Sequence, residues 1–241
     1  SFPTRRSSDL QKAGYLDRAK TDLTKALKLE PNDPLALLNR ALVYVKSREF
    51  DQAIADCNRA IAADETLADA YCIRGIAYRG KREHDKAIAD YTKALALSPR
   101  HAPTYQERGN AYTEQGLWAK AIRDYAHAIE CNPTLASAYL NRGNAYHNLG
   151  AYDKATADYR KSLEVDPVSA FRSYVCFALF CSWLKGGDTA IQAEAKKYRA
   201  AFNPGGWEGH VFDFFCGDLE EAELFAAARS VEPEKEKGQL C

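Results

Sequence analysis

The sequence lacks a net charge of either sign, because 33 Lys and Arg residues balance 33 Asp and Glu residues. Nucleic acids and anionic membranes attract basic surfaces, so this balance argues against either as the main partner. The chain also lacks the phosphate-binding loop of nucleotide-binding proteins and the GxSxG turn of serine hydrolases. Enzymatic activity therefore has no positive support, and we expect no catalytic residues and no cofactor.

Cysteine pairs of the CxxC type are missing, although the chain has seven cysteines. The nearest approach to a metal or nucleophile site is the group His210, Asp213, Cys216 and Asp218. Its spacing matches none of the strong zinc patterns, and no oxyanion element accompanies the thiol. We therefore expect no bound metal, and we interpret the cysteines as reduced packing residues.

Long apolar segments are missing as well. The most apolar stretch, Phe171 to Leu184, has fourteen residues and contains Arg172, whereas a membrane-spanning helix needs about 20 residues. This stretch predicts a buried helix within a divergent helix pair over residues 170–204, and a membrane-associating helix is the alternative. We expect no membrane span in the chain.

The chain does contain a period of 34 residues, carried by near-copies of one phrase such as EHDKAIAD. Such a period is the signature of a solenoid of two-helix units. Four series of residues keep the same register: Ala53, Ala87, Ala121 and Ala155; Ala41, Gly75, Gly109 and Gly143; Tyr44, Tyr78, Tyr112 and Tyr146; Pro31, Pro99, Pro133 and Pro167. Small residues let two facing helices approach closely, and each proline ends a second helix. The period predicts an all-α fold of antiparallel helix pairs.

This pattern resembles the tetratricopeptide repeat of bacterial proteins. The resemblance implies a right-handed superhelix whose concave groove is lined mostly by the first helix of each pair. Two features depart from the family pattern. The usual Trp is replaced by Leu or Tyr, at positions 37, 71, 105 and 139, and the residue before each small residue is Arg instead of Leu.

The register also predicts the division of the chain. We expect a non-native leader over 1–10, a partial repeat over 11–33, and complete repeats over 34–67, 68–101, 102–135 and 136–169, followed by the pair over 170–204 and a divergent helical module, truncated at its end, over 205–241. The last segment resembles the C-terminal part of some bacterial envelope lipoproteins with these repeats. Reduced cysteines favour the cytoplasm and this resemblance favours the envelope, so the compartment stays open.

Four arginines are each followed sixteen residues later by an aspartate. In a two-helix unit this separation brings the two side chains together across the pair, and a guanidinium suits a carboxylate contact. We expect structural ion pairs that fix helix register, with ligand binding as the alternative: Arg40 with Asp56, Arg74 with Asp90, Arg108 with Asp124 and Arg142 with Asp158.

The first helices supply the candidate groove residues. The resemblance places an apolar set at one end, Leu35, Leu38, Leu42 and Val45, then Asp69, Cys72, Ile76 and Arg79, then Gln106, Asn110, Thr113 and Glu114, and finally Leu140, Asn144, His147 and Asn148. Because an asparagine side chain both donates and accepts hydrogen bonds, Asn110, Asn144 and Asn148 with His147 form the best candidate patch for an extended peptide, with Arg79 and Gln106 beside it. The alternative is an ordinary polar surface.

The sequence thus favours a non-enzymatic scaffold that binds a protein or peptide partner. The Lys and Arg clamp by which some family members hold chaperone tails is not expected, because Asp69 and Ile73 stand where one pair of its cations belongs. The second hypothesis is a structural or self-associating protein, like an envelope-associated adaptor, in which the incomplete ends and the apolar run Leu35 to Val45 pack against another copy. The apolar run is open to two interpretations, a peptide pocket or the seat of a lost N-terminal helix, and solenoids need polar caps.

Overall fold

The computed structural model describes residues 5–166 and Asp213, with side chains from Gly14 onward. The chain divides into two compact units, residues 1–134 and 135–241, which are described separately below. The predicted pair over 170–204, the module over 205–241 and the group around His210 and Cys216 lie outside the described residues, Asp213 excepted.

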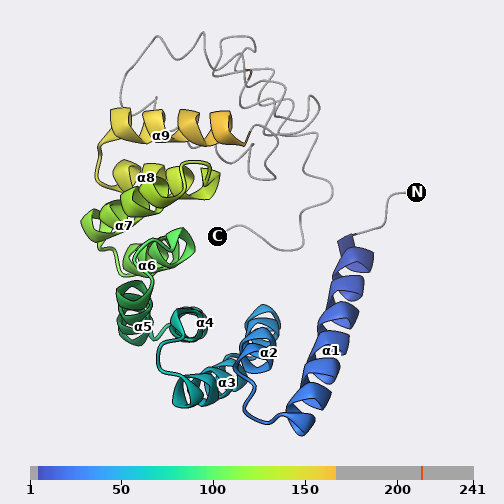
Figure 1. Cartoon of the computed structure of the whole chain (residues 1–241). Helices are drawn as coiled ribbons and strands as arrows, with labels where there is room; N and C mark the ends of the chain where they lie inside the picture. The colour runs from blue at the N-terminus through green and yellow to red at the C-terminus, as the bar shows by residue number, and fades with distance from the viewer. Residues whose placement is uncertain (1–4, 167–212, 214–241) are drawn as a thin grey trace. The chain divides into compact units, whose positions relative to one another are not determined.

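The described part of the chain consists of nine α-helices and contains no strand, which confirms the predicted all-α fold. The first unit contains α1 (Arg5–Leu29), α2 (Pro34–Lys46), α3 (Phe50–Ala63), α4 (Ala68–Gly80), α5 (His84–Leu97), α6 (Ala102–Glu114) and α7 (Trp118–Cys131), shown in Figure 1. The second unit contains α8 (Ala136–Asn148) and α9 (Tyr152–Val165). Each helix packs on its successor within its unit.

The first helices of the pairs in unit 1 also pack on one another. α2 contacts α4, and α4 contacts α6, whereas the second helices α3, α5 and α7 have no comparable packing among themselves. The chain therefore bends so that α2, α4 and α6 lie along the inside of unit 1 (Figure 1). We call the solvent-facing side of these three helices the inner face and define it by the following side chains: Leu42, Val45, Ile76, Arg79, Gln106, Glu107, Asn110 and Glu114.

Helix α1 has 25 residues, whereas the second helix of each later pair has 14. It includes residues 5–10, which belong to the segment predicted from the sequence as a leader. The helix is polar along most of its length. Among the residues that the structure describes, no helix is both long and apolar enough to cross a membrane.

In the α4–α5, α6–α7 and α8–α9 pairs, the core contains a glycine and a tyrosine that face each other. An ideal Cβ on Gly75 or Gly109 stands 2.6 Å from the Cε1 atom of Tyr91 or Tyr125. The tyrosine ring therefore occupies the volume that a side chain would need, and Tyr91 is fully buried. Gly143 and Tyr159 repeat the arrangement in unit 2, with 2.7 Å between the corresponding atoms.

The α2–α3 pair replaces both residues of this contact together. Ala41 stands at the glycine position and Cys57 at the tyrosine position, and both are fully buried. Because Cys57 has no ring, the methyl group of Ala41 fits. The series of small residues found in the sequence is therefore set by the size of the side chain on the facing helix.

The turn between the two helices of a pair uses a left-handed backbone. Arg48 and Arg82 have φ of 62°, and Gly116 and Gly150 occupy the same place with φ of 73° and 74°. A left-handed residue with a Cβ costs about 1–2 kcal/mol, and glycine avoids this cost.

We expect Arg82→Gly to raise the free energy of unfolding by about 0.5–1 kcal/mol, because the strain outweighs the added freedom of glycine in the unfolded chain. Urea unfolding followed by circular dichroism measures the change. Gly116→Ala, at the same place in the next pair, should lower stability by about 1 kcal/mol. A loss of stability in both variants would contradict this explanation.

Candidate functional site

The four arginines and four aspartates singled out in the sequence lie together in pairs. Arg74 donates from Nε and Nη2 to the two carboxylate oxygens of Asp90, at 2.7 Å each. The other three pairs repeat this two-point contact at 2.7–2.8 Å: Arg40 with Asp56, Arg108 with Asp124 and Arg142 with Asp158. The hydrogen bond to Asp90 raises the pKa of Arg74 above its usual value. Asp90 is buried, so the pair joins α4 to α5 inside the unit.

Three of these arginines make a further contact with the preceding helix pair. The Nη1 atom of Arg74 donates to Oδ1 of Asn58 at 2.7 Å. Arg40 and Arg108 donate in the same way to Thr24 and Thr92, at 3.1 Å each. Each guanidinium is therefore held by two helices other than its own, which favours the structural role over ligand binding for these residues.

Asn110, a predicted groove residue, lies over the buried tyrosine of its own pair. Its Oδ1 accepts a hydrogen bond of 2.8 Å from the Tyr125 hydroxyl, which also lies 3.0 Å from Oγ1 of Thr113. Asn144 accepts from the Tyr159 hydroxyl at 2.9 Å in the same way. The asparagines therefore have a packing role that their position on the first helix does not reveal.

Tyr91 has the same place in the α4–α5 pair, but Ile76 and Arg79 stand where the later pair has Asn110 and Thr113. Its hydroxyl is buried beside the Arg79 guanidinium and makes no hydrogen bond of normal geometry. Burial raises the pKa of Tyr91, and the charge of Glu107 raises it further.

We expect Tyr125→Phe to destabilise the chain by about 1 kcal/mol, since it removes hydrogen bonds that Asn110 and Thr113 share with the hydroxyl. Tyr91→Phe should leave stability unchanged or raise it, because it removes a buried hydroxyl that makes no hydrogen bond of normal geometry. Thermal and urea unfolding of the two variants measure the difference. Equal losses of stability would contradict the assigned hydrogen bonding.

The remaining residues of the predicted patch divide between the two units. Gln106 is half-buried on α6 of unit 1. In unit 2, the His147 ring packs edge-on against Tyr152, with ring centroids 5.3 Å apart, and Asn148 Nδ2 donates to the Asn144 carbonyl at 2.8 Å. Asn144, His147 and Asn148 thus share one side of α8, while Asn110 and Gln106 share one side of α6.

Three residues expected in the groove are not exposed there. Leu38, Cys72 and Leu140 are buried. Cys72 lies between first helices, where its Sγ accepts a hydrogen bond of 3.2 Å from Thr104 of α6. Their assignment to the groove surface is wrong, since the first helices bury side chains by packing on their neighbours.

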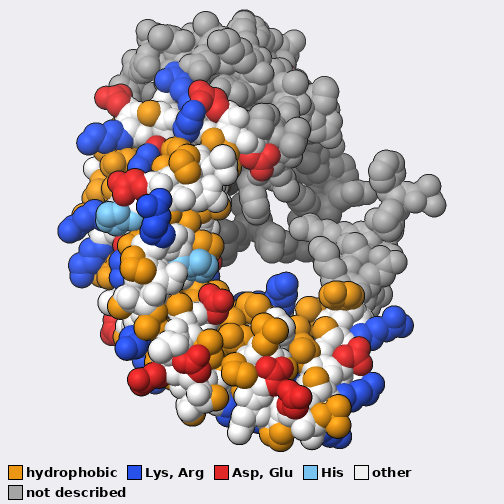
Figure 2. Space-filling model, viewed as in Figure 1, with side chains coloured by type: hydrophobic (Ala, Val, Ile, Leu, Met, Phe, Trp, Pro, Cys, Tyr) orange, Lys and Arg blue, Asp and Glu red, His pale blue; other side chains and the backbone are white. Residues whose placement is uncertain are grey.

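Among the first helices α2, α4 and α6, the exposed large apolar side chains lie on α2. Leu35 is 67% exposed and Leu42 is 37% exposed. Val45 and Ile76 are half-buried. Figure 2 shows hydrophobic side chains gathered over the region of α2 and α4. The inner face therefore begins with an apolar strip.

Next to this strip lies a charged group that joins α4, α5 and α6. Arg79 donates from Nη2 to Oε2 of Glu107 at 2.8 Å and from Nη1 to Oε1 of Glu114 at 2.7 Å. Nδ1 of His84 lies 3.3 Å from the other oxygen of Glu114. Burial opposes the charge of Arg79, but the carboxylates outweigh it and raise the pKa of Arg79. We call Arg79, His84, Glu107 and Glu114 the Arg79 cluster.

Cysteine and metal chemistry find little support in the described residues. Burial raises the pKa of the Cys57 thiol to about 12 and that of Cys72 to about 11, so neither forms a thiolate readily at neutral pH. Within residues 14–166 and at Asp213, no three His, Cys, Asp or Glu side chains are grouped so that they could hold a metal ion.

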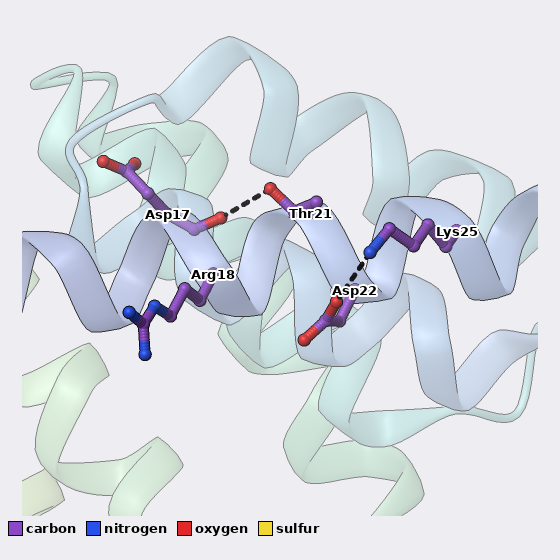
Figure 3. A pocket seen from close by; sticks show the side chains of 5 residues that line it. All are labelled: Asp17, Arg18, Thr21, Asp22 and Lys25. Carbon is purple, nitrogen blue, oxygen red and sulfur yellow. Dashed lines mark hydrogen bonds and ion pairs between the residues drawn. The ribbon is translucent and has the colours of Figure 1, made fainter.

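A polar depression of about 310 Å³ lies on α1 and is lined by Asp17, Arg18, Thr21, Asp22 and Lys25. Figure 3 shows that all five come from one helix, with the Thr21 hydroxyl directed to the Asp17 carbonyl and Lys25 directed to Asp22. No second element contributes a side chain to it. This depression therefore does not resemble a built ligand site, and the inner face remains the candidate.

The helices and their packing define a helical solenoid of two-helix units. Profiles described as tetratricopeptide repeat match residues 4–68, 68–101 and 136–167, and one described as TPR repeat matches 109–150. The chain belongs to the tetratricopeptide repeat (TPR) family. TPR proteins are generally non-enzymatic protein-interaction modules.

Solved structures agree with this assignment. The crystal structure of MamA is 31% identical, with a TM-score of 0.58 over 65% of this chain and 92% of MamA. TTC0263, a TPR protein of Thermus thermophilus, is 27% identical, with a TM-score of 0.61 over 74% of this chain and 97% of its own. PilF of Pseudomonas aeruginosa shares the fold at 20% identity, with a TM-score of 0.68 over 82% of this chain and 87% of its own. The search among curated proteins finds no match.

Proposed function

We propose that the chain is a protein-interaction scaffold that binds an extended segment of a partner along the inner face of unit 1. The observation that carries this proposal is the strip of accessible apolar side chains formed by Leu42, Val45 and Ile76 and continued by polar side chains on α6. Apolar contacts supply binding energy, and adjacent polar groups supply orientation. The scaffold needs no cofactor, metal or catalytic group for this role.

The polar residues predicted for the groove contribute to binding separately in each unit. Arg79, Gln106 and Asn110 contact the partner in unit 1. Asn144, His147 and Asn148 form a polar contact surface on α8 of unit 2. Because Asn110 and Asn144 also hold buried tyrosines, their removal changes stability together with binding, which makes them poor first variants.

A display library of random 12-residue peptides, selected on the intact chain, tests the proposal. Peptides that bind should lose at least tenfold in affinity for Leu42→Lys, because the lysine places a charge in the apolar strip. Ala55→Lys is the matched control, since Ala55 is exposed on the second helix α3. Fluorescence polarisation measures both affinities. Equal affinity of the two variants for every selected peptide would overturn the proposed surface.

A self-associating role has its own support near the start of α2. Leu29 is 85% exposed and Leu35 is 67% exposed, on either side of the turn that joins α1 to α2. Exposed apolar groups of this kind are common in contacts between copies. Sedimentation velocity over a hundredfold concentration range separates the two roles: association should weaken in Leu29→Lys/Leu35→Lys, and a parent that stays monomeric throughout would exclude it.

A further inference from the structure

The Arg79 cluster carries more negative than positive charge. One guanidinium serves two carboxylates, those of Glu107 and Glu114, and His84, which lies 3.3 Å from Glu114, adds a positive charge only when it is protonated. The other two arginines of these helices, Arg74 and Arg108, are each engaged by their own aspartate. A second cation brought to Glu114 would therefore meet an uncompensated charge.

The interior of the cluster contains two buried polar atoms without hydrogen bonds of normal geometry. The Tyr91 hydroxyl is buried and makes no hydrogen bond of normal geometry, and Nε of Arg79 is in the same condition. Glu107 and Arg79 are the charged groups that act most strongly on this hydroxyl, so the hydroxyl lies beside the cluster. An unsatisfied buried polar group costs about 1–3 kcal/mol, so the packing around Arg79 is strained in favour of the ion pairs with Glu107 and Glu114.

The α6–α7 pair shows that a tyrosine hydroxyl at this place can be hydrogen-bonded within the fold. There, Asn110 and Thr113 supply two polar partners to the Tyr125 hydroxyl. In the α4–α5 pair, Ile76 adds apolar surface where Asn110 would stand, and Arg79 draws two glutamates of α6 toward it. The α4–α6 part of the inner face therefore combines an apolar residue and surplus negative charge within a few residues.

We propose that the Arg79 cluster receives a Lys or Arg side chain of the partner, while a bulky aliphatic residue of the same segment packs on Val45 and Ile76. This inference rests on the proposed function and names the chemistry of the segment bound there. The cation pairs with Glu114, which is 39% exposed as a side chain and is thus the more accessible glutamate. The inner face of unit 1 thereby selects basic-aliphatic segments over acidic ones.

The same random 12-residue peptide library tests this selectivity. Peptides recovered on the parent chain should be enriched in Lys or Arg next to Leu, Ile or Val. Their affinity should fall roughly fivefold for Glu114→Gln, the size of effect expected for one partly exposed ion pair. Because salt screens this pair, the affinity of the parent chain for the same peptides should also fall as salt increases. Glu130→Gln, which removes an equally negative but 70% exposed carboxylate on α7, is the control and should bind as the parent does.

The outcomes distinguish the two proposals. Peptides that depend on Leu42 but carry no basic enrichment, or that bind Glu114→Gln as tightly as the parent, overturn the assigned partner chemistry and leave the scaffold intact. Peptides that ignore Leu42 as well overturn the scaffold surface itself. Circular dichroism of Glu114→Gln confirms that the variant is folded, and replacing the basic residue of a selected peptide by norleucine repeats the test without changing the protein.

Discussion

Gly109→Ala should destabilise the chain by about 2–3 kcal/mol, even though alanine is the better helix former by about 1 kcal/mol. The new Cβ would stand 2.6 Å from Cε1 of Tyr125, a ring that is 1% exposed and cannot move aside without disturbing α7. Urea unfolding of the intact chain measures the loss. Gly14→Ala in α1 is the control, because nothing lies within 4 Å of its Cβ position, and it should raise stability.

The chain itself supplies the rescue of this variant. Because the α2–α3 pair carries Ala41 opposite Cys57, we expect Gly109→Ala to add little destabilisation in a chain that already carries Tyr125→Cys. The single change Tyr125→Cys should cost about 3–5 kcal/mol through the lost ring. The double-mutant cycle should therefore give a coupling of about 2 kcal/mol or more. Additive losses would contradict the steric explanation.

Asp90→Ala should lower the free energy of unfolding by roughly 2–4 kcal/mol, because it leaves the guanidinium of Arg74 without its carboxylate. The Asp90 side chain is 9% exposed and that of Arg74 is 19% exposed, so water screens the pair only weakly. Thermal unfolding at low and high salt measures the effect, which should change little with salt.

The control for this prediction is Asp85→Ala, on the same helix. Asp85 is exposed and accepts a single hydrogen bond from Gln115, so its loss should change stability by no more than about 0.5 kcal/mol. Arg74→Leu/Asp90→Ala should regain part of the stability, since no charge is then buried alone. An unchanged melting temperature for Asp90→Ala would show that the pair contributes nothing to stability.

The helix pairs could be predicted from the sequence because the regular spacing of the repeated residues is enough to locate their helices. The phrase around Ala87 places α5, and the sixteen-residue interval predicts that Arg74 reaches Asp90, since both follow from helix geometry and turn length. The end of α1 at Leu29 likewise precedes Pro31. The change from Gly to Ala41 was visible in one series of the sequence, whereas its link to Cys57 came from the packing of the facing helices.

The candidate site was harder to predict, because helical register gives a face but not a depth. Leu38 and Cys72 share the face that carries Leu42 and Ile76, and packing between α2, α4 and α6 decides which of them reach solvent. Asn110 has the correct face as well, yet its oxygen is used by Tyr125 from the facing helix. The Arg79 cluster joins residues 28 and 35 positions apart, which no single repeat contains.

The hydrogen bonds that Arg74 and Arg108 make to the preceding helix pair bear on how unit 1 unfolds. Arg74 holds Asp90 in its own pair and Asn58 in the pair before it, and Arg108 does the same with Asp124 and Thr92. In a linear array, cooperativity depends on such coupling between neighbours. A helix pair that opens must release its neighbour's arginine as well as its own, so native-state hydrogen exchange should show α3 to α6 opening together instead of pair by pair.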